Sequence, residues 1–122
     1  MAVATMHYII DASGGDYMND DTQLLKGILE GCILELLSRE ATYGYRIVEI
    51  LQNAGIDTNE ATVYPILIRL QKQNALQIEK RSSPYGPDRK YYSLTAQGEA
   101  MRERFRSSFL RISQIVNDFF ER

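Results

Sequence analysis

Basic side chains in the middle of the chain have the most suggestive chemistry, because lysine and arginine bind phosphate. The chain has 122 residues and a formal net charge of −2. Residues 41–94 nevertheless hold seven basic and five acidic residues, whereas residues 1–40 hold two basic and seven acidic residues. A local basic surface is enough for contacts with nucleic-acid phosphates. The basic residues of the middle region are Arg46, Arg69, Lys72, Lys80, Arg81, Arg89 and Lys90.

Residue types that would support catalysis or metal binding are scarce. His7 is the only histidine and Cys32 the only cysteine, so the sequence contains no Ser/His/Asp set, no Cys/His set and no cluster of metal ligands. A phosphate-cradling glycine loop is also missing. We therefore expect no enzyme, no metal and no cofactor, and we expect Cys32 to lie in the core.

We expect no segment that would direct the protein to a membrane or out of the cell. The sequence has no run of 18 apolar residues, no basic segment followed by an apolar core near its start, and no disulfide framework. These observations predict a cytoplasmic protein that does not enter the membrane.

The helix predicted over residues 58–74 must position the side chains that could meet DNA. Its apolar stripe consists of Val63, Ile66, Leu67 and Leu70,. Thr58 or Asn59 can cap its start, and Asn74 can take the left-handed conformation that often ends a helix. Its first turns carry small polar groups and Tyr64, as does the end of a recognition helix that enters the major groove. Pro65 implies either that the helix begins late, near Thr62, or that it bends locally.

Two helices are predicted before this one. The first follows Asp20 and carries a wide apolar stripe, in which the four-residue step from Gly27 to Gly31 would let another helix approach closely. That stripe is explained either by core packing or by contact with a partner subunit. The second helix is expected to run from Tyr43 to about Asn53, and with the 58–74 helix it forms a helix-turn-helix candidate.

A two-stranded wing is predicted next. Residues 76–80 alternate apolar and polar side chains, residues 82–88 are rich in turn formers, and residues 90–94 form the second strand. Because an isolated hairpin is marginally stable, we expect the apolar side chains of both strands to pack on the helices. Arg89 and Lys90 lie beside the tip, where they can reach phosphates or the minor groove.

The last helix is predicted from a cap at Thr95 to about Phe120. At 1.5 Å per residue it is roughly 39 Å long, too long for a small domain to cover its apolar stripe. We therefore expect the excess to bury against a second copy of the chain. The stripe comprises Met101, Phe105, Phe109, Ile112, Val116 and Phe119.

Four motifs occur in an order that resembles the PadR family of transcriptional regulators, over about residues 21–98. They are Leu24–Gly27, Tyr43–Tyr45, Thr62–Leu70 and Gly86–Thr95. The single short helix at the C-terminus is similar to that of the family's short-form members. Asn74 stands where the family usually has glycine, a backbone position that asparagine tolerates.

The resemblance implies a winged helix-turn-helix repressor that binds an inverted-repeat operator in double-stranded DNA as a homodimer. For some members it also implies release by a small-molecule effector, and without tryptophan no indole-walled pocket can form in this chain. The residues that it places at DNA are Tyr43, Gly44, Tyr45, Thr62, Tyr64, Pro65, Arg69, Arg89 and Lys90. The residues that it places at the dimer interface are Leu24, Leu25, Ile28, Met101, Phe105, Phe109, Ile112, Val116 and Phe119.

The sequence thus predicts a mainly α fold with a small β-hairpin: a winged helix-turn-helix followed by a long dimerisation helix. We expect a flexible tail over residues 1–20, the DNA-binding domain over residues 21–94 and the dimerisation helix over residues 95–122. The predicted function is sequence-specific DNA binding and transcriptional repression. The alternative is a winged helix that binds proteins and no longer binds DNA, a hypothesis slightly favoured by the acidic total charge.

Overall fold

The computed structural model describes the backbone of residues 16–122 and the side chains of residues 23–122. The chain divides into two compact units, Met1–Glu30 and Gly31–Arg122. The prediction for His7, and the prediction of a flexible tail as far as residue 15, concern residues that the structure does not describe. Residues 16–20 belong to the first described helix, which begins before the expected start near Asp20.

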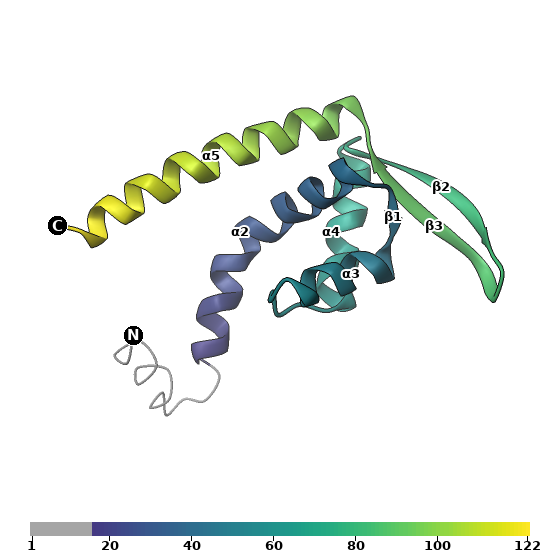
Figure 1. The fold of residues 1–122 in the computed structure, drawn as a ribbon, viewed down its shortest axis with the longest axis horizontal. Coiled ribbons are helices and arrows are strands. Elements are labelled where there is room, and N and C mark those ends of the chain that lie inside the picture. The colour runs from purple at the N-terminus through teal and green to yellow at the C-terminus, as the bar shows by residue number, and fades with distance from the viewer. Residues whose placement is uncertain (1–15) are drawn as a thin grey trace. The chain divides into compact units, whose positions relative to one another are not determined.

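The described chain is mainly helical with one small antiparallel sheet, as the sequence predicts (Figure 1). The elements in chain order are α2 (Asp16–Arg39), β1 (Thr42–Tyr43), α3 (Gly44–Asn53), α4 (Glu60–Lys72), β2 (Leu76–Ser83), β3 (Gly86–Leu94) and α5 (Ala96–Phe120).

Helix α4 has the predicted cap and the predicted end. It starts earlier than Thr62, which was one of the two alternatives that Pro65 left open. The Asn59 side chain accepts a hydrogen bond from the backbone N–H of Thr62 at 3.1 Å, and Asn74 has the expected positive φ of 61°. Pro65 lies inside the helix, so a late start near Thr62 is wrong. Because Ala61 and Pro65 are both exposed, Pro65 lies on the side of α4 where water can satisfy the Ala61 carbonyl that loses its helical hydrogen bond.

The sheet has three strands in the order β1-β3-β2. The predicted two-stranded wing is present as β2 and β3, and β1 is an additional strand that the sequence did not predict. β1 pairs Thr42 with Tyr92 and Tyr43 with Tyr91. Two residues carry no alternating pattern, and their pairing with β3 joins segments almost fifty residues apart, so no local signal announces this strand. β2 and β3 also run closer to the tip than expected, because only residues 84–85 form the turn.

The core of the second unit lies where the end of α2, α3, α4 and the base of the sheet meet. Its largest fully buried side chains are Ile33, Leu34, Ile47, Leu67, Leu70 and Val63. The three members from α4 belong to the stripe predicted from its sequence, so burial of that stripe leaves the other sides of α4 free. Each fully buried aliphatic side chain contributes about 1.5–3 kcal/mol.

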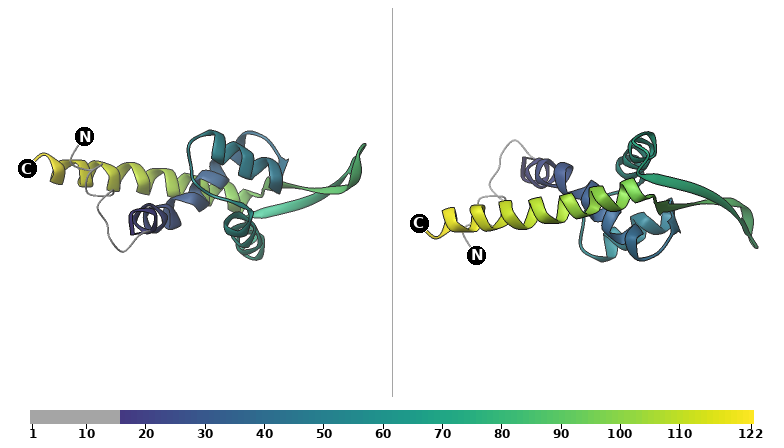
Figure 2. Two further views of the ribbon diagram at one scale, coloured as in Figure 1. Left: turned by 90° about the horizontal axis from the view of Figure 1, so that it is seen from below. Right: turned by 90° about the horizontal axis from the view of Figure 1, so that it is seen from above.

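Helix α5 is joined to the body of the second unit at its start. The Thr95 hydroxyl accepts from the Gly98 N–H at 3.0 Å and donates to the Asn74 carbonyl at 2.6 Å. A side chain at Gly98 would overlap the backbone of Ala75, so glycine permits this close contact. These contacts set the direction in which α5 leaves the sheet, away from the β2–β3 hairpin in both views of Figure 2.

The first half of α5 then packs against the end of α2. The Phe105 ring lies so close to Gly31 that a methyl group there would overlap it. Arg102 bonds Glu35 of α2 at 3.2 Å and Glu99 of its own helix at 2.8 Å. The hydrogen bonds to Glu99 and Glu35 raise the pKa of the Arg102 guanidinium above its ordinary value. The helix that approaches Gly31 is therefore the chain's own α5.

Candidate nucleic-acid interface

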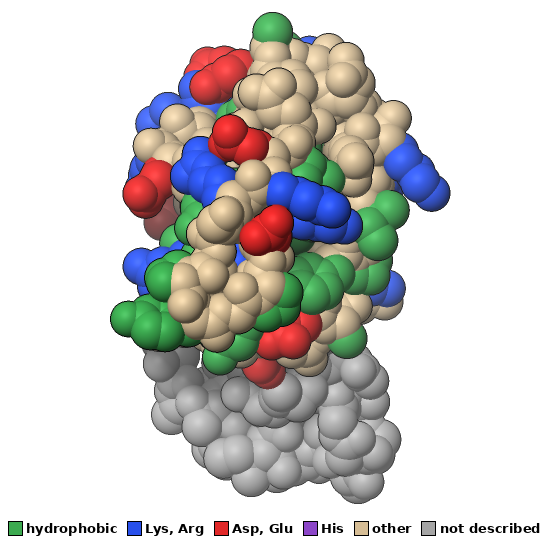
Figure 3. Space-filling view, turned by 90° about the vertical axis from the view of Figure 1, so that its right-hand side faces the viewer, with side chains coloured by type: hydrophobic (Ala, Val, Ile, Leu, Met, Phe, Trp, Pro, Cys, Tyr) green, Lys and Arg blue, Asp and Glu red, His purple; other side chains and the backbone are tan. Residues whose placement is uncertain are grey.

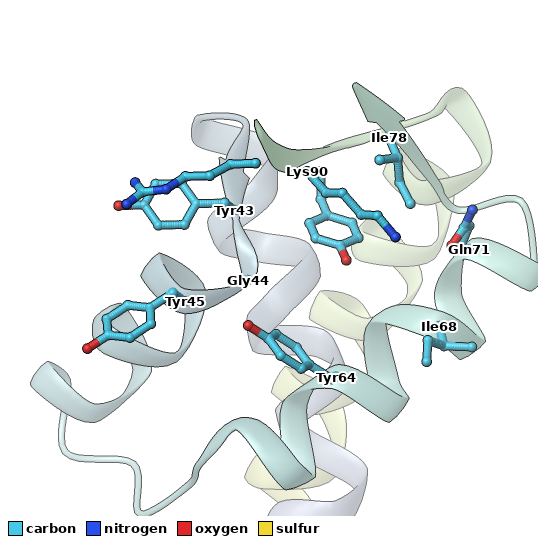
Figure 4. A pocket seen from close by; sticks show the side chains of 10 residues that line it. Tyr43, Gly44, Tyr45, Tyr64, Ile68, Gln71, Ile78 and Lys90 are labelled. Carbon is cyan, nitrogen blue, oxygen red and sulfur yellow. The ribbon is translucent and has the colours of Figure 1, made fainter. Parts of the chain in front are cut away.

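A pocket with a volume of about 500 Å³ lies between α4, the start of α3 and the sheet. The residues that line it form one concave surface. Figure 4 shows Tyr64, Ile68 and Gln71 of α4 on one side and Ile78 and Lys90 of the strands across from them. Six of the nine residues expected at DNA line this surface: Tyr43, Gly44, Tyr45, Tyr64, Arg89 and Lys90. Segments far apart in the sequence therefore meet at this surface.

Gly44 and Tyr64 join the two helices of the helix-turn-helix. The Tyr64 ring lies against Gly44, and a Cβ at that position would overlap the ring. Gly44 is therefore required by close packing, and Tyr64 remains 39% exposed on its other side. Tyr45 also lines the concave surface and is 63% exposed. The ring of Tyr64 thus packs between α3 and α4 and is only partly covered by them.

The exposed side of α4 consists of two stripes. Tyr64, Ile68 and Gln71 line the concave surface. The remaining predicted residues, Thr62, Pro65 and Arg69, are exposed and follow one another at steps of three and four, so they share the neighbouring stripe. The three are not brought to the concave surface but flank it, on the part of α4 that faces outward.

The Tyr92 hydroxyl in this surface is a hydrogen-bond donor at neutral pH. Burial raises the pKa of Tyr92 above its ordinary value of 10, and the nearby Tyr64 raises it further. Tyr92 therefore stays protonated and uncharged, which suits contact with an anionic backbone. A neutral phenol can donate to a phosphate oxygen without adding charge repulsion.

The wing adds cationic groups and an exposed tip. The Arg89 guanidinium lies 4.3 Å from the centre of the Tyr43 ring, while Lys90 points toward the concave surface (Figure 4). Tyr85 at the turn is 97% exposed. Figure 3, seen from the side on which the wing projects, shows basic side chains at several separate points with acidic ones among them. Basic side chains at separate points suit contacts with individual phosphates, whereas a continuous basic patch would not show this spacing.

The structure adds site residues that the sequence did not indicate. Ile68, Gln71, Ile78 and Tyr92 also line the concave surface. Only Ile68 could have been suspected from the sequence, because it is an apolar residue placed off the buried stripe of α4. In the structure it is 53% exposed. The others could not be found without knowing how the strands pair with each other and lie beside α4.

The residues expected at a dimer interface differ in exposure. In α5, Met101 and Phe105 are half-buried, whereas Phe109, Ile112, Val116 and Phe119 are exposed. Leu110, Ile115 and Phe120 are also exposed apolar residues of this helix. In α2, Leu24 is 70% exposed, and Leu25 and Ile28 are half-buried.

The described residues lack two other kinds of feature. No group of three or more His, Cys, Asp or Glu side chains that could hold a metal ion occurs there. No helix in that same part of the chain has both the length and the apolarity that a membrane span needs.

Comparison with known proteins identifies relatives of this arrangement. The model of the Transcriptional regulator PadR-like family matches residues 33–104. A Streptococcus transcriptional regulator is 43% identical with a TM-score of 0.73, covering 80% of this chain and 96% of its own. A PadR-like regulator from Bacillus cereus is 39% identical with a TM-score of 0.75, over 82% and 98% of the two chains. A PadR family regulator from Eggerthella lenta is 28% identical with a TM-score of 0.78, over 90% and 98%.

Proposed function

The chain belongs to the PadR-like family of transcriptional regulators, a family of DNA-binding regulators and not of enzymes, and from this premise we propose that it is a repressor that binds an inverted-repeat operator as a homodimer. We place its action in the cytoplasm, where its DNA target lies. The observation that supports the proposal best is the concave surface, which gathers the start of α3, one side of α4 and the wing.

DNA recognition would divide between two groups of residues. Thr62, Pro65 and Arg69 occupy an exposed stripe of α4, and we propose that this stripe reads base edges in the major groove. Tyr64 and Tyr92 offer hydroxyl donors, and Arg89 and Lys90 offer cations, to the phosphates that border the groove. Under this division the α4 stripe supplies sequence choice, and the wing supplies most of the affinity.

A second copy of the chain would cover the end of α5. Phe109, Ile112, Val116 and Phe119 form one exposed apolar stripe, and burial of such a stripe is the main force that joins subunits. We propose that this stripe, with Leu24, Leu25 and Ile28 of α2, forms the interface and that Met101 and Phe105 border it. A two-fold pair would present two α4 helices to half-sites about 34–36 Å apart.

DNA selected by the protein from a random pool tests the proposal directly. We expect an inverted repeat with half-sites one helical turn apart, and protection of both half-sites in a footprint. A small-molecule effector, if the operator complex responds to one, would raise the thermal unfolding temperature and release the DNA. Selection of no sequence, with binding that does not depend on salt, would favour the protein-binding alternative.

Two substitutions test the phosphate contacts of helix and wing. Arg89→Ala should weaken binding to all sequences similarly, because it removes a cationic phosphate contact, and Tyr64→Ala should weaken operator binding by about 1.5–3 kcal/mol, because it removes a hydroxyl donor to a charged group. Arg104→Ala is the matched control, since Arg104 is exposed on α5, away from the concave surface. Thermal unfolding of each variant shows whether the fold is intact, which matters for Tyr64 because its ring packs on Gly44. Unchanged operator affinity in both variants would contradict the proposal.

A further inference from the structure

The β2–β3 hairpin holds basic residues directly opposite one another. Lys80 faces Lys90, and Arg81 faces Arg89. Successive residues of a strand point to opposite faces, so each face of the hairpin carries one pair of like charges. Like charges directly opposite in a sheet destabilise it. An anion on the hairpin would remove this repulsion, and a duplex presents one at every phosphate.

The arginine pair is supported by tyrosine rings. The Arg81 guanidinium of β2 lies 4.2 Å from the centre of the Tyr91 ring on β3, and that of Arg89 lies 4.3 Å from the Tyr43 ring on β1. The two rings are 5.4 Å apart. Each arginine therefore leans one strand toward β1 and is held on its own ring. A guanidinium on an aromatic face keeps hydrogen-bond donors at its edge, which suits a phosphate oxygen.

A carboxylate restrains one member of the pair. Arg81 donates from Nε to Glu79 Oε1 at 3.0 Å, and both side chains are largely exposed. An exposed ion pair of this kind is weak. Glu79 therefore orients Arg81 when DNA is absent and competes with a phosphate when DNA is present.

We propose that Lys80 and Arg81 bind DNA phosphates together with Lys90 and Arg89, and that Tyr91 is a positioning residue that holds Arg81 ready for that contact. This inference rests on the DNA binding proposed above and extends it to the second strand of the wing. Under this inference the wing contacts the DNA backbone through four basic side chains, with one pair on each face of the hairpin.

Salt dependence of DNA binding tests the contact itself. Each phosphate neutralised by a basic side chain adds about 0.9 to the slope of log affinity against log salt. Arg81→Ala should therefore reduce the slope by about 1, and wild-type affinity should fall roughly threefold more than that of the variant between 50 and 200 mM salt. Lys80→Ala should act similarly, and Arg104→Ala should leave the slope unchanged. A wild-type slope in both wing variants would overturn the inference.

A double-mutant cycle tests the positioning role of Tyr91. Arg81→Lys keeps the charge but loses the planar group, and Tyr91→Leu removes the ring but keeps every charge. Each should weaken DNA binding several-fold, and the double variant should be no weaker than either single variant. Tyr91→Phe, which retains a ring, should restore binding, and Glu79→Gln should strengthen it at low salt. Independent, additive losses would overturn the positioning role, since a purely structural tyrosine would not be coupled to the chemistry of residue 81.

The same experiment distinguishes failure of this inference from failure of the proposed function. A wild-type chain that binds no DNA at 50 mM salt would refute the proposed function. A wild-type chain that binds DNA with a steep salt slope, together with unchanged slopes for Lys80→Ala and Arg81→Ala, would refute only the inference. Thermal unfolding of each variant identifies any loss of binding that comes from loss of the fold.

Discussion

The two halves of α5 carry the same apolar stripe, but only the first half is covered within its own unit. Phe105 packs over Gly31 and Arg102 pairs with Glu35. Further along, Ile112 is 50% exposed and Phe119 is 60% exposed. One continuous pattern therefore has two environments. The first half fixes the helix on the body of its unit, and the second half leaves an apolar surface exposed, where we propose that a partner binds.

The largest expected effect comes from charging the exposed half. Ile112→Glu combined with Val116→Glu would bury unpaired carboxylates in the proposed interface, which is strongly unfavourable. We expect the dimer dissociation constant to rise more than a hundredfold, or about 3 kcal/mol, as measured by sedimentation equilibrium. Far-ultraviolet circular dichroism should show an unchanged helical content. A pair of chains that survives this change would place the interface elsewhere.

A smaller effect is expected from the packed half. Phe105→Ala removes the ring that lies over Gly31, and since a fully buried phenylalanine costs about 3–5 kcal/mol when truncated, this half-buried one should cost about 2 kcal/mol. Urea unfolding at one fixed protein concentration measures the loss, because the stability of a dimer depends on concentration. An unchanged midpoint would show that this half is not held by the ring.

Two glycines of α2 form a matched pair that sharpens the comparison. A methyl group at Gly31 would overlap Phe105, whereas nothing lies within 4 Å of the same group at Gly27. Gly27→Ala should therefore stabilise the chain by up to about 1 kcal/mol through helix propensity. Gly31→Ala should instead destabilise it by about 1 kcal/mol or more through overpacking. Thermal unfolding compares the two, and destabilisation by Gly27→Ala would reveal a partner backbone at that position.

The smallest effect concerns the reactivity of Cys32, which follows Gly31 in α2. Burial raises the pKa of the Cys32 thiol above its ordinary value of 9.0, and the nearby Glu35 adds to the rise. Since the thiolate is the reactive form, alkylation at pH 8 should be slower in the folded chain than in urea. The folded rate should keep increasing as the pH rises past 9. Equal rates in the two states would contradict this environment.

Local patterns predicted the elements well, and the reasons are local. The stripe of Val63, Ile66, Leu67 and Leu70, the Asn59 cap and the left-handed Asn74 all concern side chains and backbone within one helix. The Thr95 cap likewise needs only the Gly98 N–H one turn further on. Such signals require no knowledge of the rest of the chain.

Strand pairing could not be predicted in the same way. Tyr43 was expected to open a helix, and it does precede α3, but its partner is Tyr91 on β3. That pairing forms the third strand and places the ring on which Arg89 lies. Antiparallel registers join residues far apart in sequence, so a pattern within either segment does not reveal them.

The amino-acid pattern alone indicated which faces of α4 and α5 are apolar, where α5 begins, where both helices end, and which stretch is cationic. The reason is that periodicity, capping and charge are properties of neighbouring residues. Only the tertiary structure decided that Phe105 turns inward while Phe109 stays exposed, and that the tyrosines support the wing arginines. These outcomes depend on how closely distant segments approach, which is set by packing of the whole unit.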